Sequence, residues 1–197
     1  MDGIYPADEE HIVPALEETY LLERLVDDLR LLTLAEARQL TFESKDLNLN
    51  DLVARVIRLF QAQADESSVE LALESNAADA VALLDPQRTE QVIGNLVSNA
   101  LRFVPQGGRI WIQVNKQNGT VLLTVNDNGP GVPEEQLPLI FDRFWRSEKS
   151  RARTSGGAGL GLAIAKQLVE GQGGQISAAN LPGGGLSIRI TFPSPAA

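Results

Sequence analysis

Three side-chain amides stand at a helical spacing near the middle of the chain. Gln91, Asn95 and Asn99 are four residues apart, so one face of a helix would present them in a row. Mg²⁺ is a hard cation that keeps several of its waters, so one amide carbonyl together with phosphate oxygens is enough to hold it. Amides in a helix also cap or bridge neighbouring backbone. These three residues alone therefore fit either a metal site or a local structural role.

A carboxylate followed by glycines forms a second group of interest. Asp127 ends an apolar run and precedes Gly129 and Gly131. Glycine lets the backbone approach a flat ligand closely, and an ionised carboxylate only accepts hydrogen bonds. Such a carboxylate favours the amino group of adenine over the carbonyl of guanine. Asp-Asn-Gly is also a common turn in which aspartate binds its own loop, so both interpretations stay open on these residues alone.

A glycine-rich stretch precedes a predicted helix in the last third of the chain. Gly157, Gly159 and Gly161 stand where that helix would begin. The first N–H groups of a helix have no partner within it, and together with the helix dipole they attract phosphate. A GxGxG sequence on its own is more often a flexible turn. The stretch is thus a candidate phosphate cradle whose assignment depends on its surroundings.

The segment before these glycines is rich in cations: Arg143, Arg146, Lys149, Arg151 and Arg153. Its composition suits a mobile lid that closes over phosphates. Most cations of such a run are normally solvated, and Arg143 is the one that we expect first at a γ-phosphate, because phosphoryl transfer needs its spreading negative charge neutralised. Phe141 and Phe144 are expected to anchor the lid by packing on the core, and Trp145 can share that role.

The apolar pattern predicts the elements that hold these groups. A long helix is expected from about Asp8 to Ala37, beginning or kinking at Pro14, and the break over residues 39–50 marks a boundary between residues 1–45 and 46–197. Further helices are predicted over residues 52–64, 86–103 and 160–170, and strands over 69–73, 81–84, 109–115, 121–126, 175–179 and 186–192. This order is typical of an α+β fold with helices on one face of a mostly antiparallel sheet.

Four short motifs follow one another in a fixed order: NLVSNALRF at 95–103, DNGPG at 127–131, FDRF at 141–144 and GAGLGL at 157–162. Together they resemble the N, G1, F and G2 boxes of the sensor histidine kinase catalytic domain, within the superfamily of gyrase, Hsp90 and MutL ATPases. The resemblance spans about residues 46–192. It implies a two-layer α/β sandwich of the GHKL (Bergerat) type, with a mixed, mostly antiparallel sheet covered on one face by helices and preceded by a long N-terminal helix.

The resemblance also implies ATP and Mg²⁺ as cofactors and gives each motif a role. Asn99 would bind Mg²⁺, and Asp127 would select ATP over GTP. The other expected nucleotide contacts are Phe103, Gly129, Gly131, Gly157, Gly159, Leu160, Gly161 and Leu162. The expected catalytic residues are Asn95, Arg102 and Arg143.

Asn95 stands where hydrolytic relatives such as gyrase have a glutamate that acts as general base toward water. An amide cannot accept that proton, so we expect slow ATP hydrolysis and a site better suited to passing phosphate onward. Three other positions depart from the family pattern. Phe103 replaces the commoner tyrosine, and Ala158 replaces a threonine or serine. Gln172 stands where relatives often have a histidine, and no functional consequence is assigned to that change.

The single histidine does not fit the acceptor motif of the family. His11 is followed by Ile12, where the phosphorylated histidine is followed by an acidic residue. We therefore interpret residues 1–45 as the second helix of the dimerisation hairpin, with the acceptor segment absent from this chain. Expected partners are a second copy bound through the N-terminal helix, the acceptor-histidine helix of the same kinase, and a response regulator in the full-length protein.

Composition excludes several other classes of function. The net charge of −9 and the pI near 4.7 give no overall attraction to nucleic acid. Without cysteine there can be no disulfide or thiolate zinc site, and no apolar run approaches the roughly 20 residues that span a bilayer. We expect a cytoplasmic fragment of a parent protein that can be anchored in the inner membrane.

Two alternatives remain at this point. The chain can be a nucleotide-binding and dimerisation module that has lost phosphotransfer and gates a partner instead. It can also resemble the serine kinases of the anti-sigma type, which share the ATP fold. The long N-terminal helix, joined to the rest through Leu47–Leu52, argues against the serine kinases, because they generally lack that hairpin.

Overall fold

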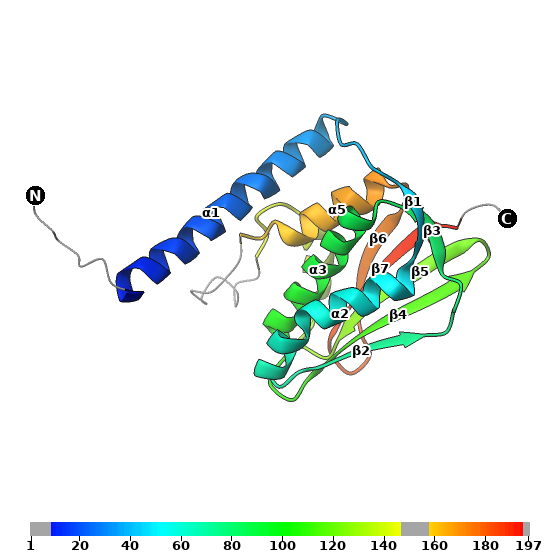
Figure 1. The fold of residues 1–197 in the computed structure, drawn as a ribbon. Coiled ribbons are helices and arrows are strands. Elements are labelled where there is room, and N and C mark those ends of the chain that lie inside the picture. The colour runs from blue at the N-terminus through cyan, green and yellow to red at the C-terminus, as the bar shows by residue number, and fades with distance from the viewer. Residues whose placement is uncertain (1–8, 147–157, 195–197) are drawn as a thin grey trace, which may run out of the picture.

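The computed structural model describes residues 9–146 and 158–194 (Figure 1). Its helices are α1 (Glu9–Glu36), α2 (Leu49–Glu66), α3 (Pro86–Phe103), the 3₁₀ helix η1 (Glu134–Leu139) and α5 (Gly161–Gly171). Its strands are β1 (Lys45–Asn48), β2 (Glu70–Ser75), β3 (Val81–Leu84), β4 (Arg109–Gln117), β5 (Thr120–Asp127), β6 (Gln175–Asn180) and β7 (Leu186–Pro193).

Five strands form the main sheet, in the order β2-β4-β5-β7-β6. Only β2 and β4 pair in parallel, and the other neighbours are antiparallel. The short strands β1 and β3 form a separate antiparallel pair. Helices α2, α3 and α5 cover one face of the main sheet (Figure 1). The predicted α+β sandwich with a mixed, mostly antiparallel sheet is thereby confirmed.

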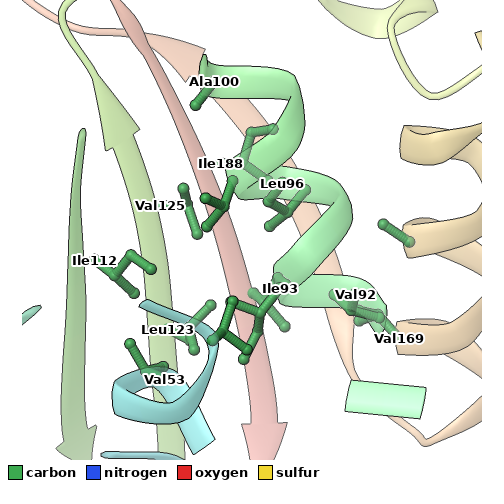
Figure 2. Packing of buried hydrophobic residues seen from close by; sticks show 14 of the residues in the cluster. Val53, Val92, Ile93, Leu96, Ala100, Ile112, Leu123, Val125, Val169 and Ile188 are labelled. Carbon is green, nitrogen blue, oxygen red and sulfur yellow. The ribbon is translucent and has the colours of Figure 1, made fainter. Parts of the chain in front are cut away.

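The core lies between this helical layer and the sheet. Alternate side chains of β4, namely Ile110, Ile112 and Val114, are fully buried beneath the helices. Burying side chains of this size stabilises the fold by roughly 1.5–3 kcal/mol each. Figure 2 shows α3 lying alongside the strands, with its apolar side chains among those of the sheet and the neighbouring helices: Val92, Ile93, Leu96 and Ala100 near Ile112, Leu123, Val125, Ile188, Val53 and Val169.

Helix α3 carries several of the predicted site residues. Asp85 caps its start by accepting a hydrogen bond from the Arg88 N–H at 3.0 Å, and Pro86 occupies the first helical position. Seven of its residues are buried on one side, from Thr89 to Leu101. The amides at 91, 95 and 99 follow a different row and are only half-buried. The core thus fixes which way these amides point.

Helix α1 begins at Glu9 and contains Pro14, so the alternative in which it starts at that proline is wrong. Proline has no N–H to donate to the carbonyl four residues earlier, so the helix continues through Pro14 without that one backbone hydrogen bond. The C-terminal half of α1 reaches the core, through the buried Leu31 and Leu32 beside α5 and the partly buried Leu25. Farther from its C-terminal end, α1 faces α2 and α3 across a pocket that Arg24, Asp27, Phe60 and Asn95 help to line. Its large exposed apolar side chains are Ile12, Val13, Leu16, Tyr20, Leu21, Leu22, Val26 and Leu29.

Two local predictions need correction. The strands predicted over 109–115 and 121–126 extend toward each other: Asn118 and Gly119 both take positive φ, at 51° and 71°, and close a two-residue hairpin, so β4 runs to Gln117 and β5 begins at Thr120. The segment after Gly129, where no helix was predicted, contains η1. Among the described helices, none is long and apolar enough to cross a membrane.

Candidate functional site

The carboxylate of Asp127 is buried at the end of β5, with 7% of the residue exposed. Its Oδ1 accepts hydrogen bonds from the backbone N–H groups of Gly129, at 2.8 Å, and Leu186, at 3.3 Å. Oδ2 accepts no hydrogen bond from any described residue. Burial raises the pKa of Asp127, and the two backbone bonds offset part of that rise. The carboxylate plane is therefore held by one oxygen while the other remains for a ligand donor.

The glycines after Asp127 leave no space for a larger residue. A Cβ on Gly129 would lie 2.9 Å from Oδ1 of Asp127 and 3.3 Å from the carbonyl oxygen of Phe103. Gly131 has φ +67°, and a Cβ there would lie 2.7 Å from Oδ1 of Asn180. The loop does make the Asx turn that its sequence allows, since Asp127 binds the Gly129 N–H. That turn and a ligand-facing Oδ2 are compatible, because they use different oxygens.

The three amides of α3 have different surroundings. Gln91 Oε1 accepts a bond from Arg88 at 3.3 Å, which is a local role. Asn95 Nδ2 donates to the carbonyl of Gly161 at 3.1 Å, so it ties α3 to the first residue of α5. The side chain of Asn99 forms no hydrogen bond with any described residue. Asn95 and Asn99 therefore both keep an amide oxygen that accepts no hydrogen bond from a described residue, and Asn99 is the one whose whole amide is left for a ligand.

The C-terminal end of α3 meets the Asp127 loop. The Arg102 guanidinium lies 5.5 Å from the centre of the Phe103 ring, a cation–π geometry. Phe103 is half-buried, and its carbonyl lies beside Gly129. Asn99 is one helical turn from Asn95 and one from Phe103, on the same side of α3. One helix therefore joins the start of α5, the expected metal ligand and the carboxylate loop.

The described part of the glycine motif also lies at this place. Gly159 takes φ +74°, where a Cβ would lie 2.7 Å from the Trp145 carbonyl. Its own carbonyl accepts a bond from the Phe144 N–H at 3.0 Å. Leu160 is buried at the start of α5, and Leu162 is half-buried. Gly157 lies outside the described residues. The helix start is thus present opposite Asn95, where a phosphate cradle was predicted.

The cationic segment is described only as far as Arg146. Arg143 pairs with Glu36 of α1, with 2.5 Å between the guanidinium Nη2 and the carboxylate. Lys149, Arg151 and Arg153 lie outside the described residues. Phe141 and Trp145 pack against the core as expected. Phe144 does not: it is 59% exposed, and its backbone takes a positive φ of +60°.

Sequence reasoning missed two polar residues that support the site. Gln172 accepts a bond from the Asp85 N–H at 2.7 Å and donates to the Leu168 carbonyl at 3.0 Å, which joins the end of α5 to the start of α3. Asn180, at the end of β6, binds Val132 just after the Asp127 loop. The unusual Gln172 was visible as a departure from the family pattern, whereas nothing near Asn180 in the sequence pointed to its partner.

The metal expected here would depend on few protein ligands. Within the described ranges, no group of three or more His, Asp or Glu side chains is placed to hold a metal ion. That fits Mg²⁺ bound by one amide oxygen, phosphate oxygens and water, and it does not fit a dedicated protein cage. The available oxygen of Asn99 satisfies this modest requirement.

Comparisons with known proteins agree with this geometry. The family described as "Histidine kinase-, DNA gyrase B-, and HSP90-like ATPase" matches residues 84–196, more than half of the chain. The signal transduction histidine-protein kinase BaeS of Escherichia coli K12 is 36% identical over 193 residues, which cover 98% of this chain and 41% of BaeS.

Two solved structures are also similar. Full-length ShkA in complex with AMPPNP superposes with a TM-score of 0.81 at 28% identity, covering 98% of this chain and 40% of ShkA. The histidine kinase ThkA in complex with the response regulator TrrA gives 0.74 at 25% identity, covering 96% and 53%. By this family match and these relatives, the chain belongs to the histidine kinase-, DNA gyrase B- and HSP90-like ATPases, and its relatives are sensor histidine kinases.

Proposed function

We propose that this chain is the catalytic core of a sensor histidine kinase that binds Mg·ATP and transfers the γ-phosphate to a histidine on a dimerisation helix. The observation that supports this most is the hydrogen bonding of the Asp127 carboxylate: Oδ1 accepts from two backbone N–H groups, while Oδ2 has no donor among the described residues. A buried acceptor of this kind matches the amino group of adenine. The AMPPNP bound to ShkA supports the nucleotide assignment.

The roles of the residues follow from their surroundings. Asp127 would accept from the adenine amino group, and Phe103 would contact the base. Asn99 would hold Mg²⁺, which when bound neutralises phosphate charge. The backbone at Gly159–Leu162 would receive the phosphates at the start of α5, with Gly129 and Gly131 lining the base side and Gly157 extending the cradle.

Two cations are proposed for the reacting phosphate. Arg102 stands at the end of α3, beside the expected base and metal sites. Arg143 is held by Glu36, so it must leave that ion pair before it can reach a phosphate. An exposed pair of this kind contributes no more than about 1 kcal/mol, so its exchange for a phosphate is energetically accessible.

The proposed partners follow from α1. Its exposed apolar side chains would pack on a second copy of the chain or on a first hairpin helix. The acceptor histidine would come from that helix, and the phosphate would pass to a response regulator, as the ThkA–TrrA complex supports. Such a kinase would work in the cytoplasm, where ATP is available.

Transfer to a separately supplied acceptor tests the proposal. The chain is mixed with γ-³²P-ATP, Mg²⁺ and a dimerisation hairpin that carries the acceptor histidine, taken from a kinase of the same family. We expect acid-labile label on the hairpin and almost none with Asn99→Ala. Saturable ATP binding without label would indicate a nucleotide-gated binding module instead, and the absence of ATP binding would refute the proposal.

Without an acceptor, we expect the chain to hydrolyse ATP very slowly. Asn95 donates to the Gly161 carbonyl and has no basic atom with which to activate water. Phosphate release is measured with purified protein, and Asn99→Ala serves as the control for contaminating ATPase. Rapid turnover that the control variant abolishes would contradict the role given to Asn95.

A further inference from the structure

The amide of Asn180 binds both polar backbone groups of a single residue. Its Oδ1 accepts from the Val132 N–H at 2.9 Å, and its Nδ2 donates to the Val132 carbonyl at 2.6 Å. An antiparallel strand forms the same paired exchange between two backbones. At the end of β6, the Asn180 side chain therefore takes the place of a backbone partner and attaches the sheet to a segment that is not itself a strand.

The hairpin formed by β6 and β7 also holds Asp127. Asn180 pairs with Leu186 across β6 and β7, and the Leu186 N–H donates to Oδ1 of Asp127 at 3.3 Å. Between them, the Leu181 N–H donates to the Gly185 carbonyl at 3.0 Å and closes the turn. The loop over residues 127–132 is thus attached at both ends to one short hairpin.

Steric contact reinforces these attachments. The loop passes so close to Asn180 that a Cβ on Gly131 would lie 2.7 Å from its Oδ1 and 3.1 Å from the Gly185 carbonyl. Gly131 also requires its positive φ of +67° at this place. The position of the loop therefore depends on the side chain at 180 as well as on its own glycines.

We propose that Asn180 is a positioning residue for nucleotide recognition: it fixes the 127–132 loop so that the Asp127 carboxylate meets the amino group of adenine. The inference rests on the proposed ATP-binding function and deepens it. Asn180 itself does not contact the nucleotide. Its effect is transmitted through Val132 and the loop backbone, so it should act on the base and not on the phosphates, which the start of α5 would hold.

The test compares two ligands in the full chain. With Asn180→Ala, we expect Mg·ATP to bind about tenfold more weakly, as the loss of two hydrogen bonds that hold the loop implies. Binding of Mg·tripolyphosphate, which has no base, should stay within about twofold of the wild type. Calorimetric titration gives both constants. Asn115→Ala, an asparagine at the far end of β4, is the matched control and should change neither.

Each outcome decides the question. An unchanged ATP affinity overturns the inference and leaves the proposed function standing, and so does an equal loss for both ligands, which would mean general damage to the fold. A wild-type chain that does not bind ATP overturns the proposed function, and the inference with it. Should Asn180→Ala fail to fold, Asn180→Asp keeps the shape and the acceptor, lacks the donor to Val132, and must show the same selective loss.

Discussion

Replacing Asp127 by asparagine is expected to weaken ATP binding at least about a hundredfold while the protein keeps its fold. The substituted amide has one oxygen and one NH₂ group. If its oxygen keeps the bonds from Gly129 and Leu186, the NH₂ group faces the adenine amino group, and two donors meet. If the amide flips, the NH₂ group meets the two backbone N–H groups instead. Titration with Mg·ATP measures the loss.

The stability of this variant should vary with pH in a defined direction. Because burial raises the pKa of Asp127 above its ordinary value of 3.8, ionisation costs folding free energy in full above the folded-state pKa; the cost shrinks as the pH falls below that pKa and is gone below 3.8. Asparagine carries no charge at any pH. The variant should therefore melt no lower than the wild type at neutral pH, and any advantage should shrink as the solution is acidified.

The control for this experiment is Asp79→Asn, at an exposed aspartate that pairs with Lys116, which should leave ATP affinity unchanged. Two results would count against the assignment of Asp127. Full ATP affinity in Asp127→Asn would show that the carboxylate does not read the base. A large drop in the melting temperature at neutral pH would show that it is needed for the fold.

Local sequence signals were sufficient for the elements that carry the site. Helix α3 has both ends where Asp85-Pro86 and the end of the apolar pattern predicted them, because capping and periodicity act within a few residues. The Asn118-Gly119 turn is equally local. The motifs in their order indicated the family, since each requires specific residue types at fixed spacing.

Contacts between distant segments could not be read in the same way. Asn180 is 48 residues from Val132, and Gln172 is 87 residues from Asp85. A side-chain amide binds whichever backbone the fold brings to it, and its own neighbours in sequence say nothing about that partner. Only the register of β6 on β7 and the packing of α5 on α3 create these pairs.

The ion-pair partner of Arg143 could not be predicted from the sequence either. The residue type of Arg143 is right for a γ-phosphate, and in this conformation it pairs with Glu36, an acidic residue 107 positions earlier at the end of α1. The residue type indicates only that the side chain pairs with some negatively charged group. Which anion it finds depends on where α1 lies, and that depends in turn on Leu31 and Leu32 packing beside α5.

Replacing Gly185 by alanine is expected to be among the most damaging single-methyl changes in the sandwich. Gly185 has φ +104°, and a Cβ there would lie 1.9 Å from the carbonyl oxygen of Asp127, a backbone atom that cannot rotate away. Strain and overpacking together should cost about 3 kcal/mol or more in the free energy of unfolding. Because the clash falls on Asp127, ATP affinity should also fall at least about tenfold. Urea unfolding and ATP titration measure the two effects.

Gly183, in the same turn, separates backbone strain from the clash. It also has a positive φ, +92°, yet a Cβ there would meet nothing within 4 Å. Gly183→Ala should therefore show the strain alone, about 1–2 kcal/mol, with ATP affinity unchanged. If the two variants lose equal stability and equal affinity, the contact between Gly185 and Asp127 is not what holds the carboxylate. If Gly185→Ala alone loses ATP, the β6–β7 turn acts on the base through the backbone of Asp127 itself.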